Sequence, residues 1–570
     1  MTPDKLLYLV LTTLALGGTG PIAHAAPQMA GRVVINEVEF PFAKCNDSTQ
    51  ATYYVRGAGA DGAISGRKWL IFLHGGGSCT TDAECAERWH DPTAGQDGII
   101  GSHENMTAST DAAKDFNGKG ILDFDGVDDA GPSNPAGPGT NPFTGFNRVM
   151  VPYCSSDSYS GRNIVSRTFN SAAHLGTSHS GNQILPLESI RFAGRHIVEA
   201  VAQLLMGGGI KTGRTTGNTP ADQVEPPSAD TDEVVISGSS AGGFGVIRNL
   251  DNMARIVHDA AASVKVFGVI DAADVVGAVP DGSITGEPDF ANATYYGATS
   301  AAEADTSCQQ APGMAGSHQC FSPVFVLKNF VETPHFVVQQ SYDGVIHGGL
   351  KQSLVQQLTQ SVPAALADRL AVQYIRNRIS AGARDLGGGV SNPQHVGYFV
   401  PNYESSKHQL MAEDEWFFNS PLASYNGNDP QLGASAPSTM GLPRGLACFR
   451  FKVTGQGSGC VDAGDAKVIN STFPTNPLTA SYDAQTSTLT LPFVRLSNNT
   501  YFQNVTVTLN PLGAVVVNDP AVGGLGTPNS YTVGTNVLTL PSVTVGGTTY
   551  ERVRVSGPGI RVLGYEELRF

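Results

Sequence analysis

Strand-like apolar runs alternate with helix-like stretches over most of residues 30–450. Five runs have the length and apolar content of buried strands: residues 69–73, 149–151, 234–236, 264–270 and 335–338. Apolar residues recur at helical spacing in residues 190–206 and 358–379. Because strands that alternate with helices build a parallel sheet covered on both faces, we predict an α/β fold with a mostly parallel central sheet.

The charge balance of the 570-residue chain excludes one class of partner. Lys and Arg total 35 against 50 Asp and Glu, so the formal net charge is −15. A chain this acidic has no general attraction for phosphate backbones, and we expect no nucleic-acid partner. Charged residues make up 15% of the chain, below the roughly 25% of an average soluble protein. With 67 glycines and 34 prolines, this composition is typical of an exported protein with long loops.

The N-terminus has the pattern of a secretory signal. A lysine precedes an apolar run over residues 6–16, and Gly and Pro residues follow that run. Ala23-His24-Ala25 is a small-x-small cleavage pattern, so we expect residues 1–25 to be a signal peptide and the mature chain to begin near Ala26. The apolar run is too short to span a bilayer. We therefore expect a secreted protein that does not cross a membrane.

Eight cysteines in an exported chain predict four disulfide bonds, although many pairings are compatible with that number. Three local pairs would each close a short loop and leave two cysteines for a fourth pair: Cys79–Cys85, Cys308–Cys320 and Cys448–Cys460, then Cys45–Cys154. The sequence contains no Cys-x-x-Cys, and its histidines do not cluster beside the thiols. A zinc site is therefore not expected.

Beyond about residue 479 the pattern changes from helical spacing to alternation. Leu489-Thr490-Leu491-Pro492 recurs 49 residues later as Leu538-Thr539-Leu540-Pro541, and an alternating strand follows each copy. Two copies of a β-hairpin unit predict a small all-β module. We therefore divide the chain into four parts: a signal peptide (1–25), an α/β domain (30–450), a linker (451–475) and a C-terminal β module (476–570).

The motif that carries the most chemistry is Gly238-Ser239-Ser240-Ala241-Gly242. It follows the strand-like run at 234–236 and precedes a helix-like run at 246–257. A Gly-x-Ser-x-Gly turn between a strand and a helix holds its serine in a strained conformation with Oγ exposed, and small flanking residues are needed there. Gly- and Ser-rich loops are common in this chain, but the strand before and the helix after favour Ser240 as a nucleophile.

A second glycine-rich segment, His74-Gly75-Gly76-Gly77-Ser78, follows the strand-like run at 69–73. Residues without Cβ allow main-chain N–H groups to approach a developing oxyanion closely. A position well upstream of the serine is the usual one for such a loop in serine hydrolases. We expect the N–H groups of Gly76, Gly77 and Ala241 to form an oxyanion hole, with His74 orienting the loop.

The acid and the base that such a serine requires are not identified by spacing. Asp271 and Asp343 each end a strand-like run, and we favour Asp343 because the residues around it are typical of a turn. Asp271 is the alternative acid, or a buttress of the site. Three histidines lie downstream of Asp343, namely His347, His395 and His408. His347 is close to the acid in sequence, and of the other two we favour His408.

These motifs resemble those of the pectin acetylesterase and Notum carboxylesterase family of α/β-hydrolases. The resemblance covers roughly residues 40–415 and rests on the order of these motifs: Cys45-Asn46-Asp47, 72–79 with Cys85-Ala86-Glu87-Arg88, Asn141-Pro142-Phe143, 146–161, 191–200, 238–243, Asp271-Ala272, Thr333-Pro334 and Tyr342-Asp343. It implies an α/β-hydrolase fold and a serine esterase with Ser240, Asp343 and His408 as its triad. It also implies the disulfides Cys45–Cys154 and Cys79–Cys85.

The implied reaction is ester hydrolysis without a metal or organic cofactor. The expected substrate is an acetylated polysaccharide such as pectin. The alternatives are a fatty-acyl or polyester substrate, an amidase or peptidase activity, and a catalytically inactive binding protein. The sequence indicates no oligomeric state.

One acidic cluster has part of the spacing of a calcium-binding loop but lacks the terminal Glu of such a loop: Asp123, Asp125, Asp128 and Asp129. We favour a solvated acidic loop over a Ca²⁺ site there.

Overall fold

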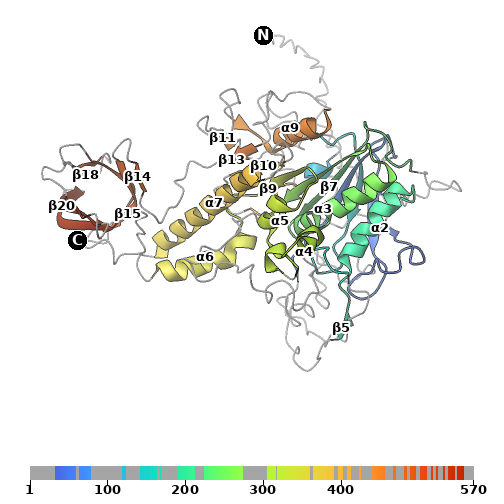
Figure 1. Ribbon diagram of the computed structural model, residues 1–570, viewed down its shortest axis with the longest axis horizontal. Helices are drawn as coiled ribbons and strands as arrows, with labels where there is room; N and C mark the ends of the chain where they lie inside the picture. Colours follow the sequence, from blue (N-terminus) through green and yellow to red (C-terminus); the bar gives the residue numbers. More distant parts are fainter. Residues whose placement is uncertain are drawn as a thin grey trace, which may run out of the picture.

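The computed structural model describes the α/β part of the chain in segments, followed by the strands of a C-terminal β region (Figure 1). The described residues are 32–59, 63–78, 119–123, 141–162, 167–168, 189–211, 224–273, 305–315, 317–359, 364–389, 396–401, 407–412, 417, 423–424, 439–455, 467–469, 481–483, 488–495, 501–509, 515–517, 522–523, 530–532, 537–545 and 548–556.

A nine-stranded sheet with the order β1-β2-β4-β3-β7-β8-β9-β10-β13 forms the centre of the described structure. Its strands are β1 (Arg32–Val34), β2 (Thr52–Arg56), β3 (Lys68–Leu73), β4 (Asn147–Val151), β7 (Glu233–Ser239), β8 (Lys265–Asp271), β9 (His335–Val338), β10 (Val396–Val400) and β13 (Lys467–Ile469). Neighbours from β4 to β13 pair in parallel, whereas β2 pairs antiparallel with both β1 and β4. The prediction of a mostly parallel central sheet is confirmed.

Helices connect and cover these strands. Their bounds are α2 (Gly194–Met206), α3 (Ala241–Ala260), α4 (Thr306–Gln310), α5 (Pro323–Asn329), α6 (Gly344–Leu358), α7 (Ala364–Gly389) and α9 (Leu442–Thr454), with 3₁₀ turns η5 (Gly120–Leu122) and η7 (His318–Phe321). The helix predicted at 358–379 is divided in the structure. Helix α6 ends at Leu358, the first residue of the predicted range, and α7 begins at Ala364. Pro363 stands before α7, and a proline disfavours the helical conformation of the residue that precedes it.

The central strands are buried on both faces, which explains their continuous apolar runs. In β3, Ile71 and Leu73 belong to one hydrophobic cluster, whereas Leu70 and Phe72 belong to another. Successive side chains of a strand point to opposite faces, so the two clusters lie on opposite sides of the sheet. Helices α2, α3, α5 and α7 pack in the first cluster and α9 packs in the second. The protein therefore has the helix–sheet–helix layering of an α/β fold (Figure 1).

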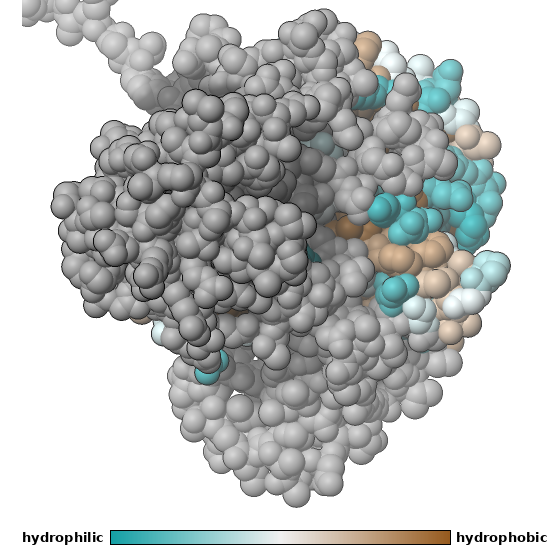
Figure 2. Space-filling view, turned by 60° about the vertical axis from the view of Figure 1, so that its left-hand side comes forward, coloured by the Kyte–Doolittle hydropathy of each residue, from teal (hydrophilic) through white to brown (hydrophobic). Residues whose placement is uncertain are grey.

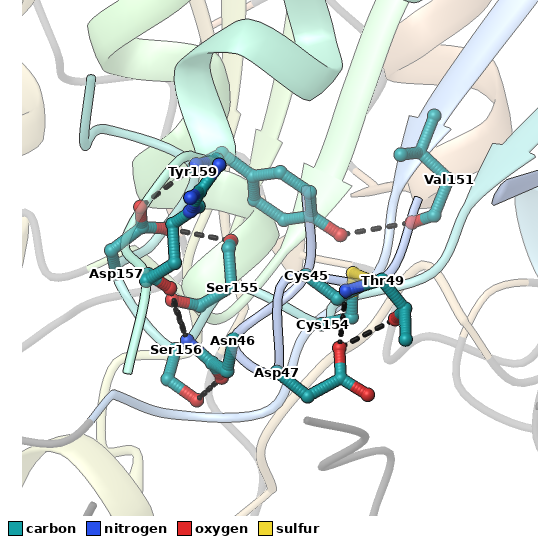
Figure 3. The surroundings of a disulfide bond; sticks show 12 residues. Cys45, Asn46, Asp47, Thr49, Val151, Cys154, Ser155, Ser156, Asp157 and Tyr159 are labelled. Atoms are coloured by element: carbon teal, nitrogen blue, oxygen red, sulfur yellow. Dashed lines mark hydrogen bonds between the residues drawn. A yellow bond between two sulfur atoms is a disulfide. The ribbon is translucent and has the colours of Figure 1, made fainter. Parts of the chain in front are cut away.

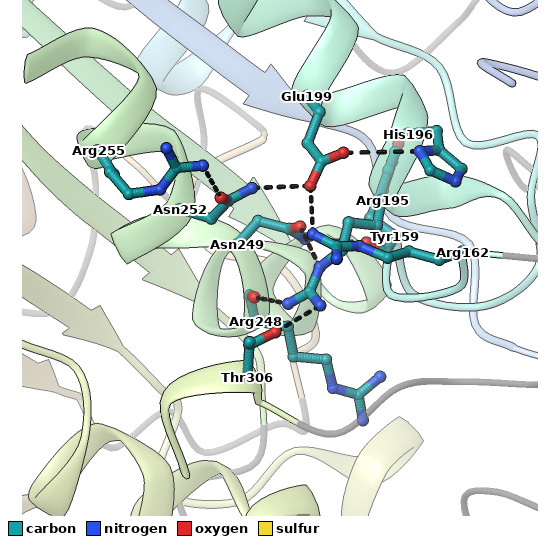
Figure 4. Close-up of polar contacts among 10 residues, drawn as sticks. All are labelled: Tyr159, Arg162, Arg195, His196, Glu199, Arg248, Asn249, Asn252, Arg255 and Thr306. Atoms are coloured by element: carbon teal, nitrogen blue, oxygen red, sulfur yellow. Dashed lines mark hydrogen bonds and ion pairs between the residues drawn. The ribbon is translucent and has the colours of Figure 1, made fainter. Parts of the chain in front are cut away.

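Buried polar side chains join helices α2 and α3 to their neighbours (Figure 4). The Arg195 guanidinium of α2 donates to Asn249 Oδ1 (3.2 Å), Thr306 Oγ1 (2.7 Å) and the Arg248 carbonyl oxygen (2.7 Å). Asn249 Nδ2 in turn donates to the carbonyl oxygen of Tyr159 (2.8 Å). Buried polar groups avoid a large desolvation cost when they are hydrogen-bonded in this way. The network therefore ties both helices to α4 and to the segment that contains Tyr159.

Two elements lie in the range expected to be a linker, residues 451–475. Helix α9 continues to Thr454, and β13 pairs in parallel with β10 at the edge of the central sheet. The α/β part of the chain therefore extends at least to Ile469. A strand of three residues is too short to be recognised by periodicity, which is why the sequence pattern did not reveal it.

Residues 481–556 contain the strands of two further sheets, both antiparallel. One has the order β14-β15-β16-β17, and in the other β20 pairs with β18, β19 and β21. The bounds are β14 (Ser481–Asp483), β15 (Thr488–Arg495), β16 (Tyr501–Leu509), β17 (Val515–Val517), β18 (Val522–Gly523), β19 (Ser530–Thr532), β20 (Val537–Val545) and β21 (Thr548–Ser556). The repeat found in the sequence coincides with the strand pairs β15–β16 and β20–β21. Two short antiparallel pairs complete the described strands: β5 (Arg167–Thr168) with β6 (Ser189–Ile190), and β11 (Ala423–Ser424) with β12 (Thr439–Met440).

The described surface mixes polar and apolar side chains. In Figure 2, hydrophilic groups in teal adjoin smaller apolar areas in brown on the coloured part of the face. Large apolar side chains exposed among the described residues include Val38, Phe42 and Val345. None of the helices in the described ranges has both the length and the apolar composition required to cross a membrane.

Candidate active site

Ser240 stands between strand β7 and helix α3, at the carboxyl end of the parallel strands. Its φ and ψ angles are 56° and −124°, a conformation that non-glycine residues rarely adopt. The Ser240 N–H donates to the Asp271 carbonyl oxygen (2.9 Å), and the Phe244 N–H donates to the Ser240 carbonyl oxygen (3.0 Å). Backbone strain persists where surrounding contacts over-determine it, and these contacts do so here. The strand before this serine and the helix after it are those that the sequence predicted.

The glycines around Ser240 are required by close main-chain contacts. A Cβ on Gly238 would lie 2.4 Å from the Gly242 carbonyl oxygen, and a Cβ on Gly242 would lie 2.0 Å from the Leu73 carbonyl oxygen. Both distances are far below van der Waals contact, so neither position accepts a side chain without a main-chain shift. The start of α3 therefore packs directly against the end of β3.

The loop after β3 passes against the serine. A Cβ on Gly75 would lie 3.0 Å from the Ser240 Cβ. Gly76 and Gly77 follow with φ angles of 151° and 68°, which favour glycine. Ala241 is the first residue of α3, and the N–H groups of the first helical turn have no partner within the helix. The loop at Gly75 is therefore packed closely against Ser240, the residue that directly precedes α3.

His74 and Tyr159 anchor this loop. The His74 N–H donates to the Val151 carbonyl oxygen (3.1 Å), and the Tyr159 hydroxyl lies 3.1 Å from the His74 carbonyl oxygen and 2.9 Å from that of Val151. Burial lowers the pKa of His74 to about 4, against a smaller opposing effect of the Gly75 main chain. The ring is therefore neutral at neutral pH and adds no positive charge beside the loop. These contacts agree with the expectation that His74 orients the loop.

Asp343 and His408 form a direct hydrogen bond. His408 Nδ1 lies 2.6 Å from Asp343 Oδ2, across 65 residues of sequence. The other carboxylate oxygen, Oδ1, accepts from the N–H groups of Val345 (2.9 Å) and Ile346 (3.2 Å) at the start of α6. These two donors at the start of α6 fix the orientation of the Asp343 carboxylate. Asp343 is fully buried and the His408 side chain is 16% exposed, so the pair is shielded from bulk water on the side of the acid.

Of the other two histidines, one is described and it has a different partner. His347 Nδ1 accepts from the Asp343 main-chain N–H (3.2 Å), and the His347 N–H donates to the Asp343 carbonyl oxygen (2.8 Å). His347 therefore contacts the main chain of the acid and supports the turn at the start of α6. His395 lies outside the described residues.

Two glutamines that the sequence analysis did not identify lie at the site, one in contact with Lys407 and the other next to His408 in sequence. The Gln340 Oε1 accepts from the Lys407 main-chain N–H. Gln409 has a φ of 60°, and its Nε2 would lie 2.9 Å from a Cβ on Gly75. Gln340 follows the strand-like run at 335–338, so a polar residue at a carboxyl strand end was an available signal. Gln409 reaches the site through its backbone conformation, for which the local sequence has no signal.

Asp271, the alternative acid, is also buried at the site. Its Oδ2 accepts from Ser239 Oγ (2.8 Å) and from the Met411 main-chain N–H (3.0 Å). Burial raises the pKa of Asp271 to about 6, while these hydrogen bonds and the charge of His408 oppose the increase. The carboxylate that bonds to the His408 imidazole is that of Asp343. Asp271 instead bonds to Ser239, just before the nucleophile, and to Met411, just after His408 in sequence.

The disulfide Cys45–Cys154 joins the segment before β2 to the segment after β4 (Figure 3). A second disulfide, Cys308–Cys320, closes a short loop beside α4. Both predicted pairs are confirmed, and Cys448 is also disulfide-bonded. Three cysteines of the predicted pairs lie outside the described residues: Cys79, Cys85 and Cys460.

The acidic cluster considered for calcium is described at one residue, Asp123. Its carbonyl oxygen accepts from Arg148 (2.7 Å) and from Asn141 (2.8 Å), so its main chain is part of the packed core. The other three residues of the cluster, Asp125, Asp128 and Asp129, lie outside the described residues. Within the described segments, no group of three or more His, Cys, Asp or Glu side chains converges as a metal site would require.

A known family matches most of the chain. The model of the pectinacetylesterase family matches residues 23–216 and 226–429. These ranges contain Ser240, Asp343 and His408, and they exclude the strands β14 to β21.

Curated proteins are similar to a shorter part. The palmitoleoyl-protein carboxylesterase notum2 of Xenopus laevis is 28% identical over 228 residues, which are 40% of this chain and 34% of that protein. The palmitoleoyl-protein carboxylesterase NOTUM of Drosophila melanogaster is 30% identical over 229 residues, which are 40% of this chain and 25% of that protein. The chain thus spans about a third or less of the length of these relatives.

A solved structure of the Wnt deacylase Notum from Drosophila is similar with a TM-score of 0.44 and 20% identity. The similarity covers 79% of this chain and 100% of that one.

Proposed function

The chain belongs to the pectinacetylesterase family, and on that premise we propose that it is an exported serine carboxylester hydrolase. Its nucleophile is Ser240, its base is His408 and its acid is Asp343. Its substrate is an acetylated polysaccharide such as pectin, from which it removes acetyl groups. Export is supported by the N-terminal signal pattern and by the disulfides Cys45–Cys154 and Cys308–Cys320.

The observation that carries this proposal is the 2.6 Å contact between His408 Nδ1 and Asp343 Oδ2. An ionised Asp343 keeps the imidazole proton on Nδ1, which leaves Nε2 able to accept a proton. His408 then removes the proton of the Ser240 hydroxyl as its oxygen attacks the ester carbonyl. The buried carboxylate stabilises the imidazolium that forms.

The same His408 completes the reaction. It donates its proton to the departing alcohol of the sugar, and the acetyl group remains on Ser240 as an ester. A water molecule then attacks that ester, with His408 as general base again, and acetate leaves. Every proton transfer uses the one imidazole.

Negative charge on the carbonyl oxygen requires donors in place before the reaction. We assign this role to the N–H groups of Gly76, Gly77 and Ala241. The contact of Gly75 with Ser240 and the start of α3 directly after the serine support the assignment. Each such donor contributes roughly 3 kcal/mol to transition-state stabilisation in comparable hydrolases.

The relatives favour a second candidate substrate. Two proteins similar to 40% of this chain are named palmitoleoyl-protein carboxylesterases. A fatty-acyl ester is therefore the alternative to an acetylated polysaccharide, with the same chemistry at Ser240 and a longer acyl group.

The C-terminal strands suggest a separate unit outside the reaction. We propose that residues 476–570 form a β module, since β14 to β17 pair in one sheet, β18 to β21 pair in another, and all lie outside the matched family ranges. The catalytic part then corresponds to residues 30–450, extended by β13.

A series of p-nitrophenyl esters from acetate to palmitate tests the function, with Ser240→Ala as the matched control. We expect hydrolysis to be fastest with acetate, acetate release from acetylated pectin, and a loss of at least about 10⁴-fold in kcat for Ser240→Ala. If hydrolysis is instead fastest with long acyl chains, the substrate is a fatty-acyl ester and not an acetylated polysaccharide. Equal background rates in both proteins would contradict the enzyme hypothesis.

A further inference from the structure

Asp271 contacts both halves of the proposed site. Its Oδ2 accepts from Ser239 Oγ (2.8 Å), next to the nucleophile, and from the Met411 main-chain N–H (3.0 Å), three residues after His408. The Leu410 N–H also bonds to this carboxylate. The Asp271 carbonyl oxygen accepts from the nucleophile's own N–H (2.9 Å). A single residue therefore joins the turn of the nucleophile to the segment of the base.

The direction of the Asp271 side chain is set by its surroundings. The residue is fully buried at the end of β8, in register with Ser239 on β7 and Val338 on β9. The next residue, Ala272, has a φ of 52°, and its N–H donates to the Val338 carbonyl oxygen (3.0 Å). A strained residue held by a strand on its far side leaves the carboxylate little freedom.

The hydrogen bond to Asp343 does not replace this link. Asp343 and Gln340 hold His408 and Lys407 from the side of β9 and α6. Neither of these bonds involves the turn of the nucleophile. The Asp271 carboxylate is a direct hydrogen-bonded link between the turn of the nucleophile and the segment of the base.

The Asp271 carboxylate also lowers the stability of the folded protein in a way that its packing does not offset. Its Oδ1 is buried and has no hydrogen-bond partner among the described residues. An unpaired buried carboxylate oxygen is destabilising. The register partners Ser239 and Val338 are uncharged, while the charge of a protonated His408 interacts favourably with Asp271. A negative charge at this place stabilises the imidazolium together with Asp343.

We propose that Asp271 is a positioning residue that sets the separation and angle between Ser240 and His408. It does so through Oδ2, which accepts from both Ser239 Oγ and the Met411 main-chain N–H. The proposal rests on the proposed function, since it presumes that Ser240 and His408 react together.

The test is Asp271→Asn, which keeps the size of the side chain and removes its charge. We expect kcat on p-nitrophenyl acetate to fall about 10- to 100-fold with KM within about threefold, because a misplaced base slows the chemical step. We also expect the acid limb of the kcat/KM profile to move to lower pH by about 0.5 to 1 unit. The Asp271 carboxylate interacts favourably with a protonated His408, so removing its charge disfavours the protonated imidazole, which Asp343 still contacts.

Two further variants separate positioning from folding. Asp305→Asn replaces another buried aspartate, which accepts from the Cys308 N–H (2.8 Å) at the start of α4, and it should leave kcat and the acid limb at wild-type values. Ser239→Ala removes one donor to Asp271 and keeps the charge, so kcat should fall about threefold or more with no shift of the acid limb. If circular dichroism shows that Asp271→Asn does not fold, the kcat of Ser239→Ala decides whether Asp271 is a positioning residue.

Wild-type kcat and an unmoved acid limb in Asp271→Asn would overturn the proposal. So would an equal loss of kcat in Asp305→Asn, or wild-type kcat in Ser239→Ala. If Ser240→Ala is inactive, these outcomes contradict only the role of Asp271 and leave the proposed function intact. If Ser240→Ala hydrolyses the ester as fast as the wild type, the proposed function itself has failed.

Discussion

Two regions of the molecule contain buried polar groups on strained main chain, and the hydrogen-bond partners of these groups differ between the regions. The catalytic edge comprises residues 240, 271–272, 343 and 407–412, and the disulfide cluster comprises residues 45–49 and 151–161. Non-glycine residues with positive φ occur in both: Ser240, Ala272 and Gln409 in the first, and Ser48, Ser156, Ser158 and Tyr159 in the second. Each region also contains a buried aspartate whose pKa burial raises to about 6, Asp271 in the first and Asp157 in the second.

The partners of the two aspartates distinguish the regions. Asp157 accepts from Ser155 Oγ (2.6 Å) through one oxygen, and from the N–H groups of Gly161 (3.0 Å) and Gly194 (2.9 Å) through the other. Figure 3 shows this local arrangement beside the disulfide. Asp271 has one oxygen without a hydrogen-bond partner in the described part of the chain, and its donors come from two segments far apart in sequence.

This difference shows that strain and a raised pKa do not by themselves identify a reactive site. In the disulfide cluster both features serve the packing of one segment against the start of α2. At the catalytic edge the same features bring separate segments together around Ser240. We therefore expect substitutions in the first region to change mainly stability, and substitutions in the second to change mainly kcat.

Among the changes that compare the two regions, the largest effect should follow from Asp343→Asn. The amide cannot accept from Nδ1–H through its nitrogen, so the imidazole proton moves to Nε2 and the base can no longer accept from Ser240. We expect kcat to fall about 10⁴-fold, with a small change in stability because the amide oxygen still accepts from Val345 N–H. Steady-state kinetics and urea unfolding measure both. A loss below about tenfold would remove Asp343 from the proposed triad.

Removal of the disulfide should affect the other region. The bond between Cys45 and Cys154 joins residues 109 apart, so cleaving it releases a long loop in the unfolded chain. The double variant Cys45→Ala/Cys154→Ala should lose about 2–4 kcal/mol of unfolding free energy, while kcat of the folded protein stays within about threefold.

The matched control for this double variant is Cys308→Ala/Cys320→Ala. Its cysteines are 12 residues apart, so we expect a stability loss smaller by about 2 kcal/mol. Urea unfolding at 25 °C compares the two variants. A loss of kcat larger than the loss of folded protein would show that the disulfide cluster has a part in the reaction.

A smaller, pH-dependent effect is expected for Asp157→Asn. Burial raises the pKa of Asp157 from its ordinary value of 3.8 to about 6, so between these values the folded state binds more protons than the unfolded state. Wild-type stability should therefore lose on the order of 2 kcal/mol from this group as pH rises from about 4 to about 6. The variant lacks that loss, so its stability relative to the wild type should improve over the same range.

Urea unfolding at several pH values measures this change, and the kinetic acid limb serves as the comparison. Asp157 lies in the disulfide cluster, so the acid limb of Asp157→Asn should match the wild type, in contrast to Asp271→Asn. A shift of that limb would mean that the two regions are coupled electrostatically. The Tyr159 hydroxyl, which contacts the His74 carbonyl, is the connection to examine in that case.

Local patterns in the sequence predicted the α/β class, the parallel sheet and the turn at Ser240. Buried parallel strands require continuous apolar runs, and a strand–turn–helix with a strained serine requires small flanking residues. Such requirements act within a few residues and are therefore visible in the sequence. The short strand β13 and the division between α6 and α7 were missed because neither is marked by a long periodic segment.

The tertiary structure decided which of several possible residues meet. The local sequence favoured Asp343 and His408 but left Asp271 and two other histidines open, and the family resemblance implied the same pair. Their hydrogen bond spans 65 residues, and the link from Asp271 to Met411 spans 140. Contacts over such distances depend on how loops close at the carboxyl edge of the sheet, and no local pattern encodes that closure.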